Sequence, residues 1–343
     1  RWSHHLLSEM RLVEKSRQEN APLPLPQIES IGHQYKFASK RLFILTYNGV
    51  LGPDFSAVPH GTQAVNAQVA SLLKRLCDDA LNTVYVIGGH NTSNLEAMFA
   101  GMPNLGLIGE YGFTYSMPQA IDQGTVDEAG AESTRAHLLL ESATSKRLSR
   151  TWHLTIGRGF DIDWKEDVQK VMSHFVMRTP GAFVDTSYYS CVVWRYQHAD
   201  REVGDAQTKE LFTLLKSAMA MSLRSAEVIL SESARAIVVR PRGCNNAVAL
   251  SHVFATLQPS SKMAENPGVG TSDPRKAPSY DFCVCMGSHR YDLPMFKSFS
   301  TWYRSGFLLN AYGCVLPKIT CHAQYYLENK EAATELLEIC LQT

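Results

Sequence analysis

One segment has the frame of a phosphate-transfer site but lacks the reactive groups: it is RLFILTYNGVLGPDF, residues 41–55. An apolar run, Leu42–Leu45, leads into a turn that contains Gly49. A turn of this shape usually presents a pair of aspartates at the end of a buried strand. Here the two positions hold Thr46 and Asn48. The segment is therefore either a phosphatase site that has lost its carboxylates or a strand that was never catalytic.

The elements around this segment predict a parallel α/β sheet. Apolar runs indicate strands at residues 42–45, 83–89 and 104–112, and amphipathic stretches indicate helices at residues 62–76 and from about residue 91. Chemistry in such a sheet lies at the carboxyl ends of the strands. Thr46, Asn48, Gly88 and Gly89 all lie at such ends.

The pattern changes at residue 151, which predicts a separate α+β unit. Its expected elements are a helix, two strands and a second helix, at residues 164–175, 182–185, 191–196 and 207–221. Further strands are expected at residues 235–241 and 281–287, and further helices at residues 246–254 and 332–341. The predicted fold class is therefore α/β, with a parallel sheet core that a smaller α+β unit interrupts.

The composition indicates which classes of partner and which cell compartment to expect. The 343 residues include 33 Lys and Arg against 33 Asp and Glu, so the formal net charge is zero and favours neither nucleic acid nor an anionic membrane. No apolar run approaches the ~20 residues that span a bilayer. The eight cysteines form no C-x-x-C pair, which favours buried, reduced thiols and a cytoplasmic protein. Because the chain starts at Arg1, we expect it to be a piece of a longer protein.

Several segments together resemble the trehalose-6-phosphate phosphatases of the haloacid-dehalogenase-like superfamily. The segment RTPGAFVDTSYYSCVVWRYQHAD resembles the cap of that family. DFCVCMGSHRYDLPMF resembles its last metal loop, and AQYYLENKEAATELL resembles its closing helix. RWSHHLLSEM and YKFASKRLFIL resemble the junction that follows a synthase-like half in two-domain trehalose proteins. The resemblance implies a haloacid-dehalogenase-like, Rossmann-type core with an inserted α+β cap domain: a linker from an upstream synthase-like domain at 1–38, core at 39–118, the cap at 151–234 and core again at 235–343. Residues 119–150 lose the apolar period and are rich in Gln, Gly, Ala, Glu, Ser and Thr, so we interpret them as a surface insertion.

The resemblance also implies what each altered position would do. The family frame D-x-D-G-T supplies a nucleophile and then a general acid and base, and here these positions are Thr46 and Asn48. Residues that act as such a unit can each be worth on the order of 10⁴ in rate. The serine or threonine hydroxyl of the second motif is replaced at Gly88, and the lysine of the third at Asn246.

The fourth motif, G-D-D-x-x-D, supplies acidic magnesium ligands in the family. Here it reads GSHRYD, so that Ser288 and His289 replace two carboxylates and only Asp292 remains. Magnesium prefers several hard oxygen ligands in octahedral geometry. We therefore expect no cofactor, and magnesium binding that is weak or absent.

The cap resembles the family's sugar-contacting frame but lacks its lysine. Asp185 can still accept a sugar hydroxyl, and Arg195 and Arg290 are the other candidate residual ligand contacts. His289 with Asp292 also has the spacing of a new metal or acid–base pair, or of an ordinary loop hydrogen bond. His90 stands at an expected helix start, where a capping or surface role is favoured.

The leading hypothesis is a non-catalytic regulatory and scaffolding subunit, a pseudophosphatase domain in trehalose biosynthesis. The resemblance to fungal regulatory subunits implies trehalose-6-phosphate synthase and phosphatase subunits as partners. Two alternatives stay open, a sugar-phosphate-sensing binding module and a weak trehalose-6-phosphate phosphatase. The sequence does not decide whether a small-molecule ligand binds.

Overall fold

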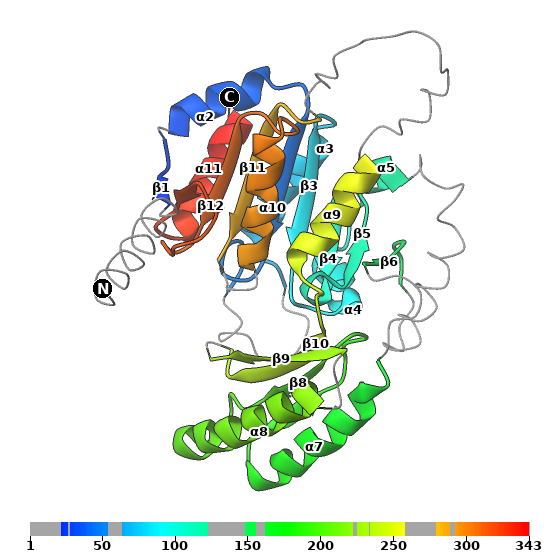
Figure 1. Cartoon of the computed structure of the whole chain (residues 1–343). Coiled ribbons are helices and arrows are strands. Elements are labelled where there is room, and N and C mark those ends of the chain that lie inside the picture. Colours follow the sequence, from blue (N-terminus) through cyan, green and yellow to red (C-terminus); the bar gives the residue numbers. More distant parts are fainter. Residues whose placement is uncertain are drawn as a thin grey trace, which may run out of the picture. The chain divides into compact units, whose positions relative to one another are not determined.

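The computed structural model describes residues 22–26, 28–53, 64–122, 148–155, 162–221, 225–232, 234–257, 279–288 and 292–342 (Figure 1). The chain divides into two compact units. The first comprises Arg1–Leu51, Ala67–Tyr85 and Leu250–Thr343, and the second comprises Gly52–Asn66 and Val86–Ala249. Residues 1–21 of the expected linker, most of the expected insertion at 119–150 and the residues His289 and Arg290 lie outside the described residues.

A parallel sheet forms the first unit. Its strands follow the order β1 (Leu23–Pro24), β13 (Tyr325–Tyr326), β12 (Ala311–Val315), β11 (Phe282–Gly287), β2 (Arg41–Thr46) and β3 (Asn82–Ile87). The pairs β11–β12 and β11–β2 are parallel. Strands β2 and β11 are buried along their whole length, as continuous apolar runs in parallel sheets are. The parallel core that the sequence predicts is therefore confirmed.

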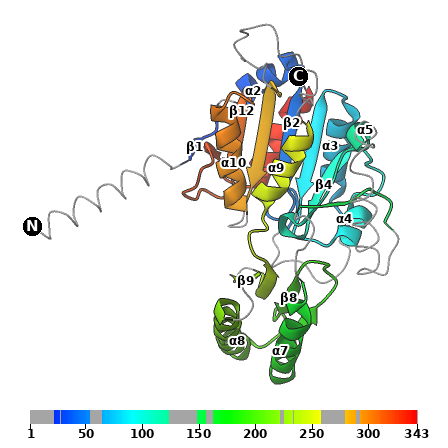
Figure 2. The same cartoon turned by 45° about the vertical axis from the view of Figure 1, so that its right-hand side comes forward.

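Helices cover this sheet on both sides. They are α2 (Ile28–Phe37), α3 (Ala67–Asp78), α10 (Leu293–Arg304) and α11 (Lys330–Gln342). Helix α10 lies over one face in Figure 2, whereas α11 and α3 lie behind it. Helix α11 packs against both α2 and α3. The rings of Tyr35, Phe43 and Phe282 meet at 5.5–6.1 Å between centroids and fix α2 on the sheet.

The expected linker at 1–38 differs from the structure in its described part. Residues 28–37 form helix α2, with Ile31 and Tyr35 buried. Residues 23–24 form β1, which pairs with β13. The sequence IESIGHQYKF has too few apolar residues for a clear helical period, which explains why this helix was not predicted.

Strand β3 passes from the first unit into the second at Tyr85–Val86. In the second unit the strand order is β3, β4 (Leu105–Gly109), β5 (Thr114–Ser116) and β6 (His153–Leu154), with β4–β5 and β5–β6 antiparallel. Helix α4 (Thr92–Met98), the short 3-10 turn Glu110–Gly112 and helix α5 (Gln119–Asp122) lie between them. Helix α9 (Asn246–Leu257) begins in this unit and ends in the first.

The second unit also contains an antiparallel four-stranded sheet. Its order is β7 (Phe183–Asp185), β8 (Val192–Arg195), β10 (Ala236–Pro241) and β9 (Ala226–Ser231). Helices α7 (Trp164–Arg178) and α8 (Arg201–Met221) cover one face of it (Figure 1). Trp164, Trp194, Leu211 and Ile237 are among the buried residues of this core. We call this sheet with its two helices the cap module.

The cap was expected to end at residue 234, with the strand at 235–241 returning to the parallel core. Instead, β10 pairs antiparallel with both β8 and β9, so the cap module extends to Pro241. The strand is buried along its whole length, and a continuous apolar run does not distinguish a central antiparallel strand from a parallel one.

All eight cysteines are free and buried, as the spacing predicted. In the part of the chain that the structure describes, no helix combines the length and the hydrophobicity that crossing a bilayer requires.

Candidate functional site

In the first unit, Thr46 lies at the carboxyl end of β2. Its Oγ1 donates a hydrogen bond of 3.2 Å to the backbone oxygen of Met286 on β11. The register explains this contact, because Leu45 pairs with Met286. Thr46 is 3% exposed. Its hydroxyl therefore joins two neighbouring strands, and a neutral hydroxyl in that position is a poor nucleophile at neutral pH.

Ser288 and Asn48 face each other across the same strand ends. The Oγ of Ser288 donates a hydrogen bond of 2.8 Å to the backbone oxygen of Asn48. Asn48 is 3% exposed. Since an amide side chain does not release a proton to a leaving group, this pair offers neither a nucleophile nor a general acid.

Asp292 immediately precedes helix α10 and is buried. Its Oδ2 accepts a hydrogen bond of 2.9 Å from the backbone N–H of Ser288. The carboxylate packs closely on Gly287, where an added Cβ would stand 2.8 Å from the Cβ of Asp292. Asp292 therefore closes the turn that leads from β11 into α10.

The first unit thus brings together four of the residues singled out in the sequence: Thr46, Asn48, Ser288 and Asp292. They offer a magnesium ion one carboxylate, and that carboxylate binds a backbone N–H of its own turn. Both hydroxyls direct their protons at backbone carbonyls. Among the described residues no group of three or more His, Cys, Asp or Glu side chains has metal-binding geometry. This donor set does not fit the oxygen cage that magnesium prefers.

In the second unit, Gly88 to His90 follow β3. The N–H of Gly88 donates to the backbone oxygen of Ile108 on β4, 2.9 Å away. The loop then continues into Asn91, whose Oδ1 accepts from the N–H of Asn94 at 2.8 Å and caps helix α4. The capping role expected near this helix start therefore belongs to Asn91.

His90 contributes no charge to this loop. Burial and the nearby positive charge of Arg195 lower the pKa of its imidazole to about 4. Loss of hydration disfavours the charged form, and a neighbouring cation does the same. His90 is therefore neutral at physiological pH.

Asn246, for which the sequence resemblance predicts the position of the family's lysine, is the first residue of helix α9 and is 5% exposed. The preceding residue, Asn245, caps this helix, because its Oδ1 accepts from the N–H groups of Ala247 and Val248 at 2.9 and 3.2 Å. The first turn of α9 is thus held by neutral amides.

Asp185 and Arg195 lie together, but they bind each other. The Nε of Arg195 is 3.4 Å from Oδ2 of Asp185, and both side chains are 9% exposed. Arg195 also donates to the hydroxyl of Tyr188 at 3.2 Å. The Oγ and N–H of Ser187 donate to Oδ1 of Asp185 at 2.6 and 3.1 Å. The two candidate ligand contacts are therefore parts of a buried network inside the cap module.

Sequence reasoning missed Glu110 and Lys165. Glu110 follows β4 and is 1% exposed. Burial raises the pKa of its carboxyl, although hydrogen bonds from Ser190 and Tyr189 act in the opposite direction. The signal that could have revealed it is a single carboxylate in the otherwise apolar run NLGLIGEYG, since buried carboxylates need partners.

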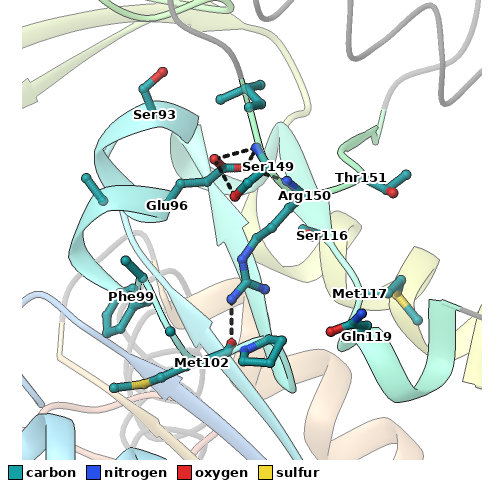
Figure 3. Close-up of a pocket in the computed structure, with 15 residues that line it drawn as sticks. Ser93, Glu96, Phe99, Met102, Ser116, Met117, Gln119, Ser149, Arg150 and Thr151 are labelled. Carbon is teal, nitrogen blue, oxygen red and sulfur yellow. Dashed lines mark hydrogen bonds between the residues drawn. The ribbon is translucent and has the colours of Figure 1, made fainter.

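The hollow in Figure 3 has a volume of about 640 Å³ and is lined by residues of α4, β5 and the segment around Arg150. Its charged groups bind the protein itself. Glu96 accepts from the N–H groups of Ser149 and Arg150 at 2.9 Å, and the Arg150 guanidinium donates to the backbone oxygens of Met102 and Leu105 at 2.5 and 2.6 Å. These contacts tie residues 148–152 to α4 and β4.

Comparison with known proteins finds a trehalose-phosphatase family model and relatives named for trehalose-phosphate enzymes. The family model "Trehalose-phosphatase" matches residues 44–330. A probable α,α-trehalose-phosphate synthase 10 of Arabidopsis thaliana is 27% identical over 314 residues, which cover 91% of this chain and 30% of that protein. A trehalose-phosphatase of Schizosaccharomyces pombe is 22% identical over 87% of this chain and 28% of its own length. The chain therefore spans about 30% of the length of the curated relatives it matches.

Two solved structures from Candida albicans share the fold. One is the C-terminal domain of trehalose-6-phosphate phosphatase, with a TM-score of 0.68, 19% identity and coverage of 94% of this chain and 99% of that one. The other is the C-terminal domain of a trehalose synthase regulatory protein, with a TM-score of 0.59, 15% identity and coverage of 93% and 99%.

Proposed function

Because the chain belongs to the trehalose-phosphatase family, we propose that it is a non-catalytic regulatory and scaffolding domain of a trehalose-6-phosphate synthase and phosphatase complex. The family fold is present, with a parallel core and a cap module. We propose that this fold, without the carboxylates that the family chemistry uses, serves to bind partner subunits.

One observation carries the proposal. At the ends of β2 and β11, the side chains of Thr46 and Ser288 each donate a hydrogen bond to a backbone carbonyl of the other segment. Attack on phosphorus needs an anionic or base-activated oxygen, and departure of the sugar alkoxide needs a proton donor. The hydroxyls of Thr46 and Ser288, which donate to backbone carbonyls, and the amide of Asn48 are uncharged and supply neither. They stabilise the strand ends instead.

The electrostatics support the same conclusion. Clustered carboxylates repel one another unless a metal ion or protons separate them. Thr46, Asn48 and Ser288 leave Asp292 as the single acidic side chain of the four residues that meet there. We propose that this domain binds magnesium weakly or not at all and that its fold is stable without it.

The partners are inferred from the relatives. A matched relative is named a trehalose-phosphate synthase, and a structural neighbour is the C-terminal domain of a trehalose synthase regulatory protein. We propose synthase and phosphatase subunits as the proteins that this domain contacts, in the cytoplasm. A pull-down tests this proposal: the tagged domain is mixed with purified synthase and phosphatase subunits, and the retained proteins are identified. Failure to retain either subunit at micromolar concentrations contradicts it.

A sensor of sugar phosphates is the main alternative. Asp185 and Arg195 were the candidate contacts for such a ligand, and the pair that they form with each other supports scaffolding over sensing. Isothermal titration calorimetry with trehalose-6-phosphate separates the two functions. We expect no saturable heat, whereas saturable heat without phosphate release identifies a sensor.

A further inference from the structure

The segment Ser187–Ser190 lies between β7 and β8 in the cap module and is bound by the two loops that follow β3 and β4. The first contact is made by Glu110, directly after β4. Its carboxylate accepts hydrogen bonds from the N–H of Tyr189 at 2.9 Å, the N–H of Ser190 at 2.7 Å and the Oγ of Ser190 at 2.5 Å. Three donors on two consecutive residues therefore converge on one buried carboxylate.

Lys165, in the first turn of α7, holds the same segment from within the cap module. Its Nζ donates to the backbone oxygens of Tyr188 and Tyr189 at 2.9 and 2.6 Å. Glu110 and Lys165 also attract each other electrostatically. The peptide groups around Tyr189 thus lie between an anion that binds their N–H groups and a cation that binds their carbonyls. Each charged hydrogen bond is stronger than a neutral one.

The loop after β3 makes the second contact. The Nδ2 of Asn91 donates to the Oγ of Ser187 at 3.0 Å, and Ser187 in turn donates to Asp185. The ring of Phe113, after β4, lies 5.9 Å from the ring of Tyr189. Both ends of the segment are therefore bound by residues of the loops that follow β3 and β4.

The turn that carries Glu110 is itself held in an unusual conformation. Glu110, Tyr111 and Gly112 have φ angles of 50°, 57° and 89°. Non-glycine residues adopt this region rarely and at an energetic cost. Gly112 lies against the entry to α9, where an added Cβ would stand 2.4 Å from the carbonyl carbon of Asn245. Thr155 donates to the backbone oxygen of Gly112 at 2.9 Å. The turn thus contacts both chain segments that lead to and from the cap module.

We propose that Glu110, Lys165 and the segment Ser187–Ser190 form a latch that fixes the cap module to the end of β4. Release of the module would remove all three donors from a carboxylate that is otherwise buried, so the contact is broken as a unit. Within the second unit, the cap module and the turn Glu110–Gly112 therefore move as one body. The inference depends on these contacts alone and holds whether or not the domain is catalytic.

Hydrogen–deuterium exchange of the full chain, followed by mass spectrometry, tests the latch. In the unmutated protein we expect peptides that cover residues 187–191 to exchange as slowly as those of β8. The variant Glu110→Gln keeps the size of the side chain but replaces one acceptor oxygen by a donor and removes the charge. We expect it to accelerate exchange at residues 187–191 by ~10-fold or more and to leave β2 and β11 unchanged.

Glu96→Gln is the matched control. Glu96 also accepts two backbone N–H groups and a serine hydroxyl in the same unit, but at residues 149–150. It should accelerate exchange there and leave residues 187–191 unchanged. If Glu110→Gln does not fold, Ser190→Ala, which removes one of the three bonds, is expected to accelerate the same peptides by about 3-fold. Unchanged exchange at 187–191 in the folded variants, or equal acceleration in β2 and β11, overturns the latch.

Discussion

The hydroxyl of Ser288 donates a hydrogen bond to the backbone carbonyl of Asn48 over 2.8 Å. This bond joins the segments that follow β11 and β2, the two strands whose carboxyl ends carry the family's nucleophile and metal positions. Together with the bond from Thr46 to Met286, it joins the carboxyl ends of the two strands through uncharged hydroxyl groups. The same backbone frame thus remains folded without the charges that phosphoryl transfer requires.

Restoring the two carboxylates alone should not restore catalysis. We expect the double variant Thr46→Asp, Asn48→Asp to release no phosphate from trehalose-6-phosphate, because Asn246 and Ser288 still lack the cation and the metal ligand of the family. The buried negative charges should also lower the free energy of unfolding by about 3 kcal/mol or more. Phosphate release and urea unfolding measure the two effects.

Thr46→Val is the control for this variant, since it keeps the shape and introduces no charge. It removes the hydrogen bond to Met286 and should lower the free energy of unfolding by about 1 kcal/mol. Magnesium-dependent turnover by the double variant, at equal or higher stability than the unmutated protein, would show that the remaining positions support catalysis after all.

Gly112 should tolerate no side chain. We expect Gly112→Ala to lower the free energy of unfolding by at least about 3 kcal/mol, because the new Cβ strains a positive φ and also overlaps Asn245. Gly101→Ala is the matched control, since Gly101 has φ 82° but nothing within 4 Å of an added Cβ. That variant should lose about 1 kcal/mol from strain alone. Equal losses in urea unfolding would contradict the close packing at Gly112.

His90 should make the fold less stable in acid. Its folded-state pKa is about 4, below the ordinary value of 6.5. As the pH falls from 6.5 to 4, His90 binds a proton in the unfolded chain but stays neutral in the folded chain. The free energy of unfolding therefore decreases over this pH range, by about 3 kcal/mol at most, and above pH 6.5 the His90 contribution to it is present in full.

The variant His90→Gln lacks this titration. Between pH 7.5 and pH 4.5 its free energy of unfolding should therefore rise relative to that of the unmutated protein by about 2–3 kcal/mol. Urea unfolding at both pH values gives this difference. A constant difference between the two proteins would show that His90 titrates normally in the folded chain.

The long elements could be predicted from the sequence because their patterns repeat. Strands β2 and β11 are continuous apolar runs, and α7 begins at Trp164 as its spacing predicted. Strands β1, β6 and β13 have two residues each, too few to show any period. The placement of β10 depends on its pairing with β8 and β9, which no local pattern contains.

For the site, residue types at Thr46, Asn48 and Asn246 could be compared with a known frame directly from the sequence. The hydrogen-bond and ion-pair partners of the site residues could not. The pairing of Asp185 with Arg195 spans ten residues, and that of Glu110 with Ser190 spans eighty. Such contacts form only when the chain folds, and the first of them pairs Asp185 and Arg195, two expected ligand groups, with each other.

We propose that the carboxyl ends of β2 and β11 do not transfer a phosphoryl group. The most direct test of this proposal is phosphate release from trehalose-6-phosphate by the purified full chain in the presence of magnesium, beside a heat-denatured blank and an active family phosphatase. We predict release equal to the blank at all enzyme concentrations. Release that rises with protein concentration, depends on magnesium and is abolished in the Asp292→Asn variant would show that these strand ends are catalytic.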